Sequence, residues 1–213
     1  MSRFLPLFPL SLVVFPGEQL RLHIFEERYK QLINECLEES KTFGIPTVID
    51  QHVVTIATEV SVVAFDRKYA NGEMDITTEG IQRVRVEAFY EEAPDKLYPG
   101  GEISLLHDEM EREAGQVEEV SDLLVQYHQA LGIHKTFGSE DEPISAYLIG
   151  HHIGLSLKQE YELLSLNREV DRLDYIKKHL IAILPVVQET ERLKTKVKMN
   201  GHFKKVIPPN IKQ

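Results

Sequence analysis

Two adjacent histidines, His151 and His152, are the residues whose types come closest to metal or acid–base chemistry. Neighbouring residues of a helix point about 100° apart, whereas two ligands on one helix that share a metal are typically spaced i, i+4. We therefore expect a structural or solvent-exposed role for this pair and no metal site. Runs of acidic residues are typical of solvated faces or loops. These runs are Glu26-Glu27, Glu91-Glu92, Glu118-Glu119 and Glu140-Asp141-Glu142.

The sequence contains none of the common motifs for phosphate binding, nucleophilic catalysis or zinc binding, such as GxxxxGK[ST], GxGxxG, GxSxG, SxxK, HExxH or CxxC. The single cysteine, Cys36, lies on the apolar stripe of an expected helix, so core packing is favoured over reactivity. We expect a protein that is not an enzyme and holds no cofactor. A hydrolase with dispersed catalytic residues is the weaker alternative.

The formal charge of −10 is distributed unevenly along the 213 residues. All 34 acidic residues precede residue 192, whereas residues 192–213 hold seven of the 24 Lys and Arg residues. The body therefore carries −17 and the tail +7, and an acidic body argues against broad contact with nucleic-acid phosphates. We favour contact of the tail with a helix end or with the acidic body over nucleic-acid binding. The candidate basic contact residues are Arg192, Lys194, Lys196, Lys198, Lys204 and Lys205.

The N-terminal run from Phe4 to Phe15 is apolar and follows Arg3, as in the hydrophobic region of a signal peptide. Pro6, Pro9 and Pro16 would break an inserting helix, and the run is shorter than the roughly 20 residues that span a bilayer. We predict a short buried strand that leads into a Pro16-Gly17 turn. The protein is expected to be cytoplasmic, without a membrane segment.

The end of this run is the candidate peptide-binding patch, because an exposed apolar surface marks an interaction site. The alternative is that these side chains are buried in the core, as such residues often are. The sequence favours neither possibility. The patch residues are Leu12, Val13, Phe15 and Pro16.

The first half of the chain reads as an α+β domain with a mixed or mostly antiparallel sheet and one early helix. The helix is expected over residues 25–37, where apolar residues recur at helical spacing, and Asn71-Gly72 predicts a hairpin turn. Alternation of apolar and polar residues, or β-branched composition, indicates the strands. These are residues 20–24, 43–49, 55–65, 74–78, 84–88 and 102–106, together with the N-terminal run.

The second half reads as a helical bundle. Apolar periodicity predicts helices over residues 117–131, 144–153, 157–166 and 170–200, with Ser156 as a cap and Pro185 as the site of a kink. We predict a β-rich subdomain over residues 1–108, a helical subdomain over 109–200 and a basic tail over 201–213.

Leu5 to Leu10, Val13 to Gly17 and Leu20 to Tyr29 resemble the opening of the Lon protease N-terminal domain family, with its L-P-L-x-P-L strand, its V-x-F-P-G turn and the strand and helix that follow. Gly80 to Val86 is similar to its central G-x-x-R-x-R-[VI] strand, and Ala146 to Leu166 to its helical A-x-x-L-x-L-x-x-[KQ]-x-x-L-L stretch.

The resemblance implies a PUA-like β-rich subdomain followed by a helical bundle that recognises unfolded or tagged polypeptides. The ATPase and peptidase parts of the protease have no counterpart in this sequence, so the resemblance implies a stand-alone, non-catalytic module that binds polypeptides or acts as an adaptor. RNA binding is an alternative, because PUA-like folds include RNA-binding modules.

Overall fold

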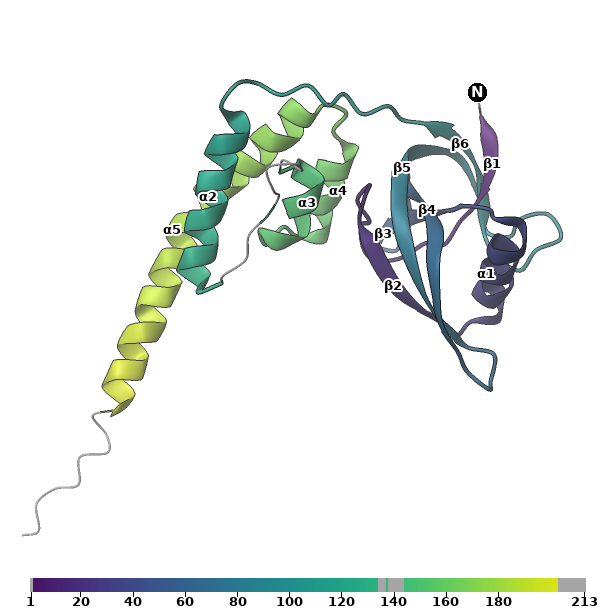
Figure 1. The fold of residues 1–213 in the computed structure, drawn as a ribbon, viewed down its shortest axis with the longest axis horizontal. Helices are drawn as coiled ribbons and strands as arrows, with labels where there is room; N and C mark the ends of the chain where they lie inside the picture. Colours follow the sequence, from purple (N-terminus) through teal and green to yellow (C-terminus); the bar gives the residue numbers. More distant parts are fainter. Residues whose placement is uncertain (1, 134–136, 138–143, 203–213) are drawn as a thin grey trace, which may run out of the picture.

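The computed structural model describes residues 2–133, 137 and 144–202 of the chain. Its strands form one antiparallel sheet in the first half of the chain, and a helical lobe follows (Figure 1). This mixed α+β architecture is the expected one. The strands are β1 (Arg3–Pro6), β2 (Gln19–Ile24), β3 (Phe43–Ile49), β4 (His52–Lys68), β5 (Met74–Tyr90) and β6 (Gly100–Leu105).

The sheet has the order β1-β6-β5-β4-β3, with β2 paired to β5 outside this path. Its two ends are joined by the segment after β1, which runs parallel to β3. Phe8 N–H donates to Gly44 O at 2.8 Å, and Leu10 N–H donates to Pro46 O at 3.1 Å. Because Phe8 and Leu10 turn towards β3, Pro9 between them occupies a position whose missing N–H would point away from the ladder.

The predicted hairpin is confirmed, since β4 and β5 are joined through Asn71-Gly72, where Gly72 N–H donates to Tyr69 O at 3.0 Å. The two strands expected over residues 74–78 and 84–88 are one continuous strand, β5. The N-terminal run forms a strand only over β1 and continues as irregular chain to Phe15.

Helix α1 (Glu27–Glu39) covers one face of the sheet with the predicted stripe, of which Tyr29, Leu32, Ile33 and Cys36 are buried. Phe25 and Leu37, expected on the same stripe, are exposed; Phe25 precedes the helix. Burial raises the pKa of the Cys36 thiol to about 12, which fits packing and not reactivity.

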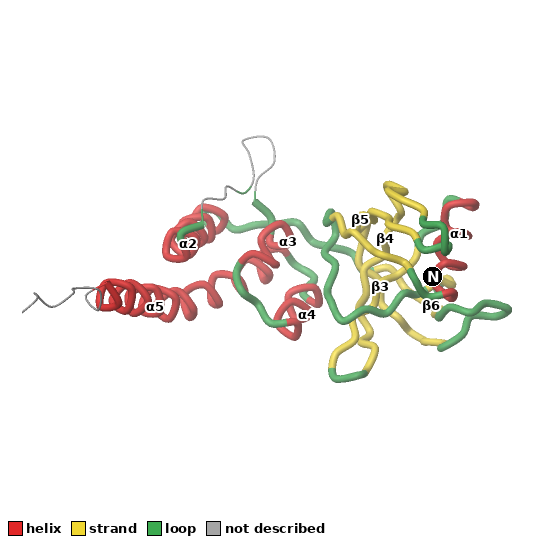
Figure 2. Tube along the Cα trace, turned by 90° about the horizontal axis from the view of Figure 1, so that it is seen from below, coloured by secondary structure: helices red, strands yellow, loops and turns green. Residues whose placement is uncertain are grey.

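The helical lobe contains α2 (Gln116–Leu131), α3 (Ala146–Ile149), a 3₁₀ turn η1 (Gly150–His152), α4 (Leu157–Ser165) and α5 (Glu169–His202). Helices α2 and α5 pack along each other (Figure 2). Ser156 caps α4 as predicted, with Gln159 completing the capping box. The helix expected over residues 144–153 is the shorter α3 followed by η1.

Helix α5 continues through Pro185, and a kink at this residue stays a prediction. The proposed subdomain boundary after residue 108 falls between β6 and α2, and it also stays a prediction, as does the PUA-like classification. Within the described residues, every helix is too short or too polar to cross a lipid bilayer.

Candidate functional site

The predicted peptide-binding patch is largely covered by the protein's own helical lobe. Val13 is 2% exposed and Phe15 is 0% exposed, so the expectation that these two side chains form a surface patch is corrected. The Phe15 ring stacks on Tyr147 with centroids 5.3 Å apart. Leu12 and Pro16 are half-buried, and Pro16 is the patch residue that lines a surface groove.

The turn after Phe15 crosses β5 at Gly80. A Cβ atom on Gly80 would lie 2.3 Å from Phe15 O, closer than any side chain tolerates. Gly17 adopts φ +80°, and its N–H donates to Gly80 O at 2.8 Å. The crossing therefore requires the glycine that begins the Gly80 to Val86 motif, and it places Phe15 and Pro16 against the helical lobe.

Arg83, the next motif residue, is fully buried between the two halves of the chain. Its guanidinium forms an ion pair with Asp108 at 2.6 Å and donates to Leu164 O at 2.9 Å and Asn167 Oδ1 at 3.1 Å. A buried cation is tolerated only when it is paired and hydrogen-bonded. Arg83 thus fixes β5 against the end of α4.

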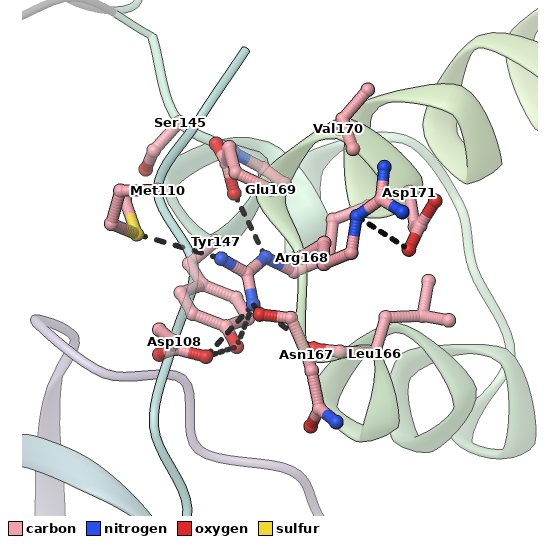
Figure 3. Close-up of polar contacts among 12 residues, drawn as sticks. Asp108, Met110, Ser145, Tyr147, Leu166, Asn167, Arg168, Glu169, Val170 and Asp171 are labelled. Atoms are coloured by element: carbon pink, nitrogen blue, oxygen red, sulfur yellow. Dashed lines mark hydrogen bonds and ion pairs between the residues drawn. The ribbon is translucent and has the colours of Figure 1, made fainter.

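A second buried arginine extends this network to α3. Arg172 pairs with Glu169 at 2.8 Å and with Asp108 at 2.9 Å, and it donates to the Tyr147 hydroxyl at 3.0 Å. Glu169 also accepts the N–H of Ala146 at 2.9 Å. Figure 3 shows the side chains of Asp108, Tyr147 and Glu169 arranged around one guanidinium group, that of Arg172. These bonds fix the position of α3, whose side chains form one wall of the groove.

A groove of about 410 Å³ lies where the two halves of the chain meet, and we call it the seam groove. Residues 16–19 form one wall and α3 with η1 forms the other. Leu148 is 42% exposed in this lining and offers an apolar contact. The helical side of the lining comprises Ser145, Tyr147, Leu148, His151 and His152.

His151 connects the two walls. Its Nε2 lies 3.0 Å from Glu18 Oε2, and its Nδ1 lies 2.8 Å from Glu160 Oε1 on α4. Burial alone would lower the pKa of His151, but hydrogen bonds to Glu160 and Glu18 outweigh it and raise the pKa to about 9. A histidine that stays protonated at neutral pH is a poor general base, so the seam groove suits binding better than acid–base catalysis.

A second hollow, of about 350 Å³, lies at the far end of the sheet. Its lining is mostly apolar and includes Phe4, Cys36 and Tyr98. Phe4 is 41% exposed there. This hollow contacts neither the helical lobe nor any residue of the predicted patch.

The basic tail residues begin on α5. Arg192 pairs with Glu189 at 3.4 Å, and Lys194 pairs with Glu191 at 2.6 Å, each along the same helix. Lys196 is exposed. The side chain of Lys198 is not among the described parts of the structure, and Lys204 and Lys205 lie outside the described residues. Among the side chains described, the ion pairs of this tail are formed with acidic residues of α5 itself, and none reaches another element.

The described residues contain no group of three His, Cys, Asp or Glu side chains with an arrangement that could hold a metal ion. The Glu18–His151–Glu160 arrangement is not predictable from local sequence patterns, because its residues come from three separate segments and follow no local periodicity. The signal that could have indicated this seam is the set of family motifs, because Val13 to Gly17, Gly80 to Val86 and Ala146 to Leu166 all meet there.

Comparison with known proteins identifies the class as a substrate-binding domain of a protease. The family model of the ATP-dependent protease La (LON) substrate-binding domain matches residues 4–182. The chain belongs to this family, and the fold is that of a substrate-recognition module. No curated protein matches the sequence.

Two solved structures share the fold. A Lon N-terminal domain protein from Xanthomonas campestris is 26% identical with a TM-score of 0.61, covering 81% of this chain and 95% of its own. The N-terminal domain of the Mycobacterium avium complex Lon protease is 15% identical with a TM-score of 0.55, covering 84% of this chain and 98% of its own. The first match is itself described as a Lon N-terminal domain protein.

Proposed function

We propose that this protein binds segments of unfolded polypeptide at the seam groove without modifying them. The observation that carries the proposal is a groove whose lining includes Pro16 and an exposed apolar side chain, Leu148, at a junction where a buried ion-pair network links the two halves of the chain. Ligand sites are typically concave, with apolar walls and a few fixed polar groups. Membership of a substrate-binding family supports the same function.

The polar groups of the groove fit recognition of a peptide. Both nitrogens of His151 are engaged by Glu18 and Glu160, which fixes the ring in one orientation. The imidazolium and its two carboxylates leave this cluster with a net negative charge, which suits basic or neutral segments. A segment bound here could be held for transfer to a separate protease, as an adaptor would do.

The test is fluorescence anisotropy with labelled, reduced and carboxamidomethylated lysozyme, a basic polypeptide that stays unfolded. We expect Leu148→Asp to weaken binding at least tenfold, because it places an unpaired charge in the apolar part of the groove. The matched control is Val125→Asp on α2, which is 52% exposed and lies outside the groove. This control should bind as the unmodified protein does.

Equal affinity of Leu148→Asp and the unmodified protein would overturn the proposal. If Phe4→Asp weakens binding of the polypeptide and Leu148→Asp does not, the binding site is the hollow at the far end of the sheet. Displacement of the labelled polypeptide by single-stranded RNA, with a steep dependence on salt, would favour the RNA-binding alternative.

A further inference from the structure

Strand β2 has a free edge beside the seam groove. Among the described residues, β2 pairs with β5 and with no other strand. Figure 1 shows β2 on the side of the sheet that faces α3 and α4. Gln19 both begins β2 and lines the groove, so the free edge and the groove are continuous.

The hydrogen bonds of this strand show which main-chain groups face outward. Gly80 N–H donates to Glu18 O at 2.9 Å, and the Thr78 hydroxyl donates to Leu20 O at 3.2 Å, so Glu18 and Leu20 turn towards β5. In an antiparallel ladder, residues that face the partner strand alternate with residues that face away from it. The N–H and C=O groups of the alternate residues therefore point away from β5.

These outward residues are Gln19, Arg21 and His23, and all three are exposed. No described residue forms a hydrogen bond to their outward main-chain groups. The β2–β5 register runs without a bulge over all six residues. The edge is therefore a regular row of unsatisfied donors and acceptors, the geometry to which another strand pairs.

The remaining edges of the sheet are closed or irregular. The segment after β1 pairs with β3 and joins the two ends of the sheet. Within the described part of the chain, the outer edge of β4 beyond residue 60 has no partner strand, but the register of β4 with β5 shifts between Val62 and Ala64 and again between Phe65 and Arg67. Bulges of this kind twist an edge away and interrupt the alternation that pairing needs.

We propose that β2 recognises the main chain of its ligand, by accepting an extended polypeptide segment as an added strand along Gln19, Arg21 and His23. This inference rests on the proposed function and specifies how the same site binds the main chain of its ligand. Main-chain pairing gives affinity for any extended segment, and a neighbouring pocket selects one side chain. Here the seam groove, with Leu148 in its wall, takes that side chain at the Gln19 end.

Amide hydrogen exchange measured by NMR tests the inference in the unmodified protein. On addition of reduced and carboxamidomethylated lysozyme, the N–H groups of Gln19, Arg21 and His23 should gain at least tenfold protection from exchange. The N–H groups of Leu20 and Leu22 already bond to β5 and should change little. Uniform protection of all five residues, or none at all, would overturn strand addition.

A pair of variants gives an independent readout by anisotropy. Arg21→Pro removes one outward N–H and leaves the β2–β5 bonds intact, so we expect at least tenfold weaker binding. Arg21→Ala keeps the N–H and should lose less than threefold. If Arg21→Pro does not fold, the exchange experiment decides alone.

The two proposals fail in different ways. If Leu148→Asp loses binding while folded Arg21→Pro binds fully, the proposal that the groove binds polypeptide stands and strand addition is overturned. Absence of any polypeptide binding by the unmodified protein would overturn both.

Discussion

At the scale of single residues, Arg83 is a fully buried cation whose partners come from three places in the chain. Asp108 follows β6, Leu164 lies in α4, and Asn167 precedes α5. Because its hydrogen bonds cross from the sheet to the helical lobe, removal of this one side chain acts on both.

We predict that Arg83→Met lowers the free energy of unfolding by about 3 kcal/mol, since it leaves buried acceptors without their donor. The measurement is urea unfolding followed by circular dichroism. The control is Arg85→Met on the same strand, because Arg85 is exposed and its loss should cost about 0.5 kcal/mol or less. Equal stability of the two variants would show that the buried network contributes nothing.

The burial of Val13 and Phe15 could not be predicted from the sequence. Both are apolar residues beside a turn, and such residues are found in cores and in binding patches alike. The element that covers them, α3, lies more than 100 residues away in the sequence. No local pattern reports such a distant contact, so burial could be known only from the tertiary structure.

At the scale of elements, the imidazole ring of His151 links the turn after Phe15 to η1 and α4. His151 belongs to η1, Glu18 to the turn and Glu160 to α4. The attraction between the imidazolium and the two carboxylates depends on the protonation of His151. The junction therefore carries a pH dependence of its own.

We predict that this contribution to stability is full below pH 6.5 and is lost as the pH rises through about 9, because the pKa of His151 is raised from 6.5 to about 9 on folding. The side chain is 28% exposed, so solvent screens the interaction and we expect about 1–2 kcal/mol. The measurement is the difference between the urea concentrations at the midpoint of unfolding at pH 6 and at pH 9.5.

The difference between the two midpoints should shrink in His151→Gln, which does not titrate in this range. His107→Gln, at an exposed histidine, should retain it. An unchanged pH dependence in His151→Gln would assign the effect to other groups.

Local periodicity was sufficient to predict most elements, because apolar spacing and caps act within a few residues. Ser156 and the Asn71-Gly72 turn are such local signals. Strand β5 was predicted as two strands, because regular alternation is interrupted before Gly80, where the consecutive residues Thr77 and Thr78 are both buried. The seam groove was not predicted, since its walls come from distant segments.

At the scale of the whole molecule, the two halves of the chain share one core. Val13, Phe15 and Ile56 from the sheet half lie in the same buried cluster as the helical residues Leu163 and Leu173. A shared core couples the two halves, so they should unfold together in a single transition.

Phe15→Ala is predicted to lower the free energy of unfolding by about 3–5 kcal/mol, through the cavity that it leaves between the halves. We also expect differential scanning calorimetry to resolve two transitions where the unmodified protein shows one. Phe25→Ala, at an exposed position before α1, is the control and should retain the single transition. A single transition in Phe15→Ala would show that the remaining apolar contacts and the polar network suffice to couple the halves.

The pairing of β1 with β6 sets the order in which this protein can fold. Phe4 lies opposite Glu102, so the first strand has no partner until β6 has left the ribosome. Contacts between such distant residues form late, because the entropy of closing a long loop must be overcome first. Strand β1, at the start of the apolar N-terminal run, is therefore unpaired until the last strand of the sheet has been translated. During its own synthesis the protein presents the kind of extended apolar segment that we propose it binds.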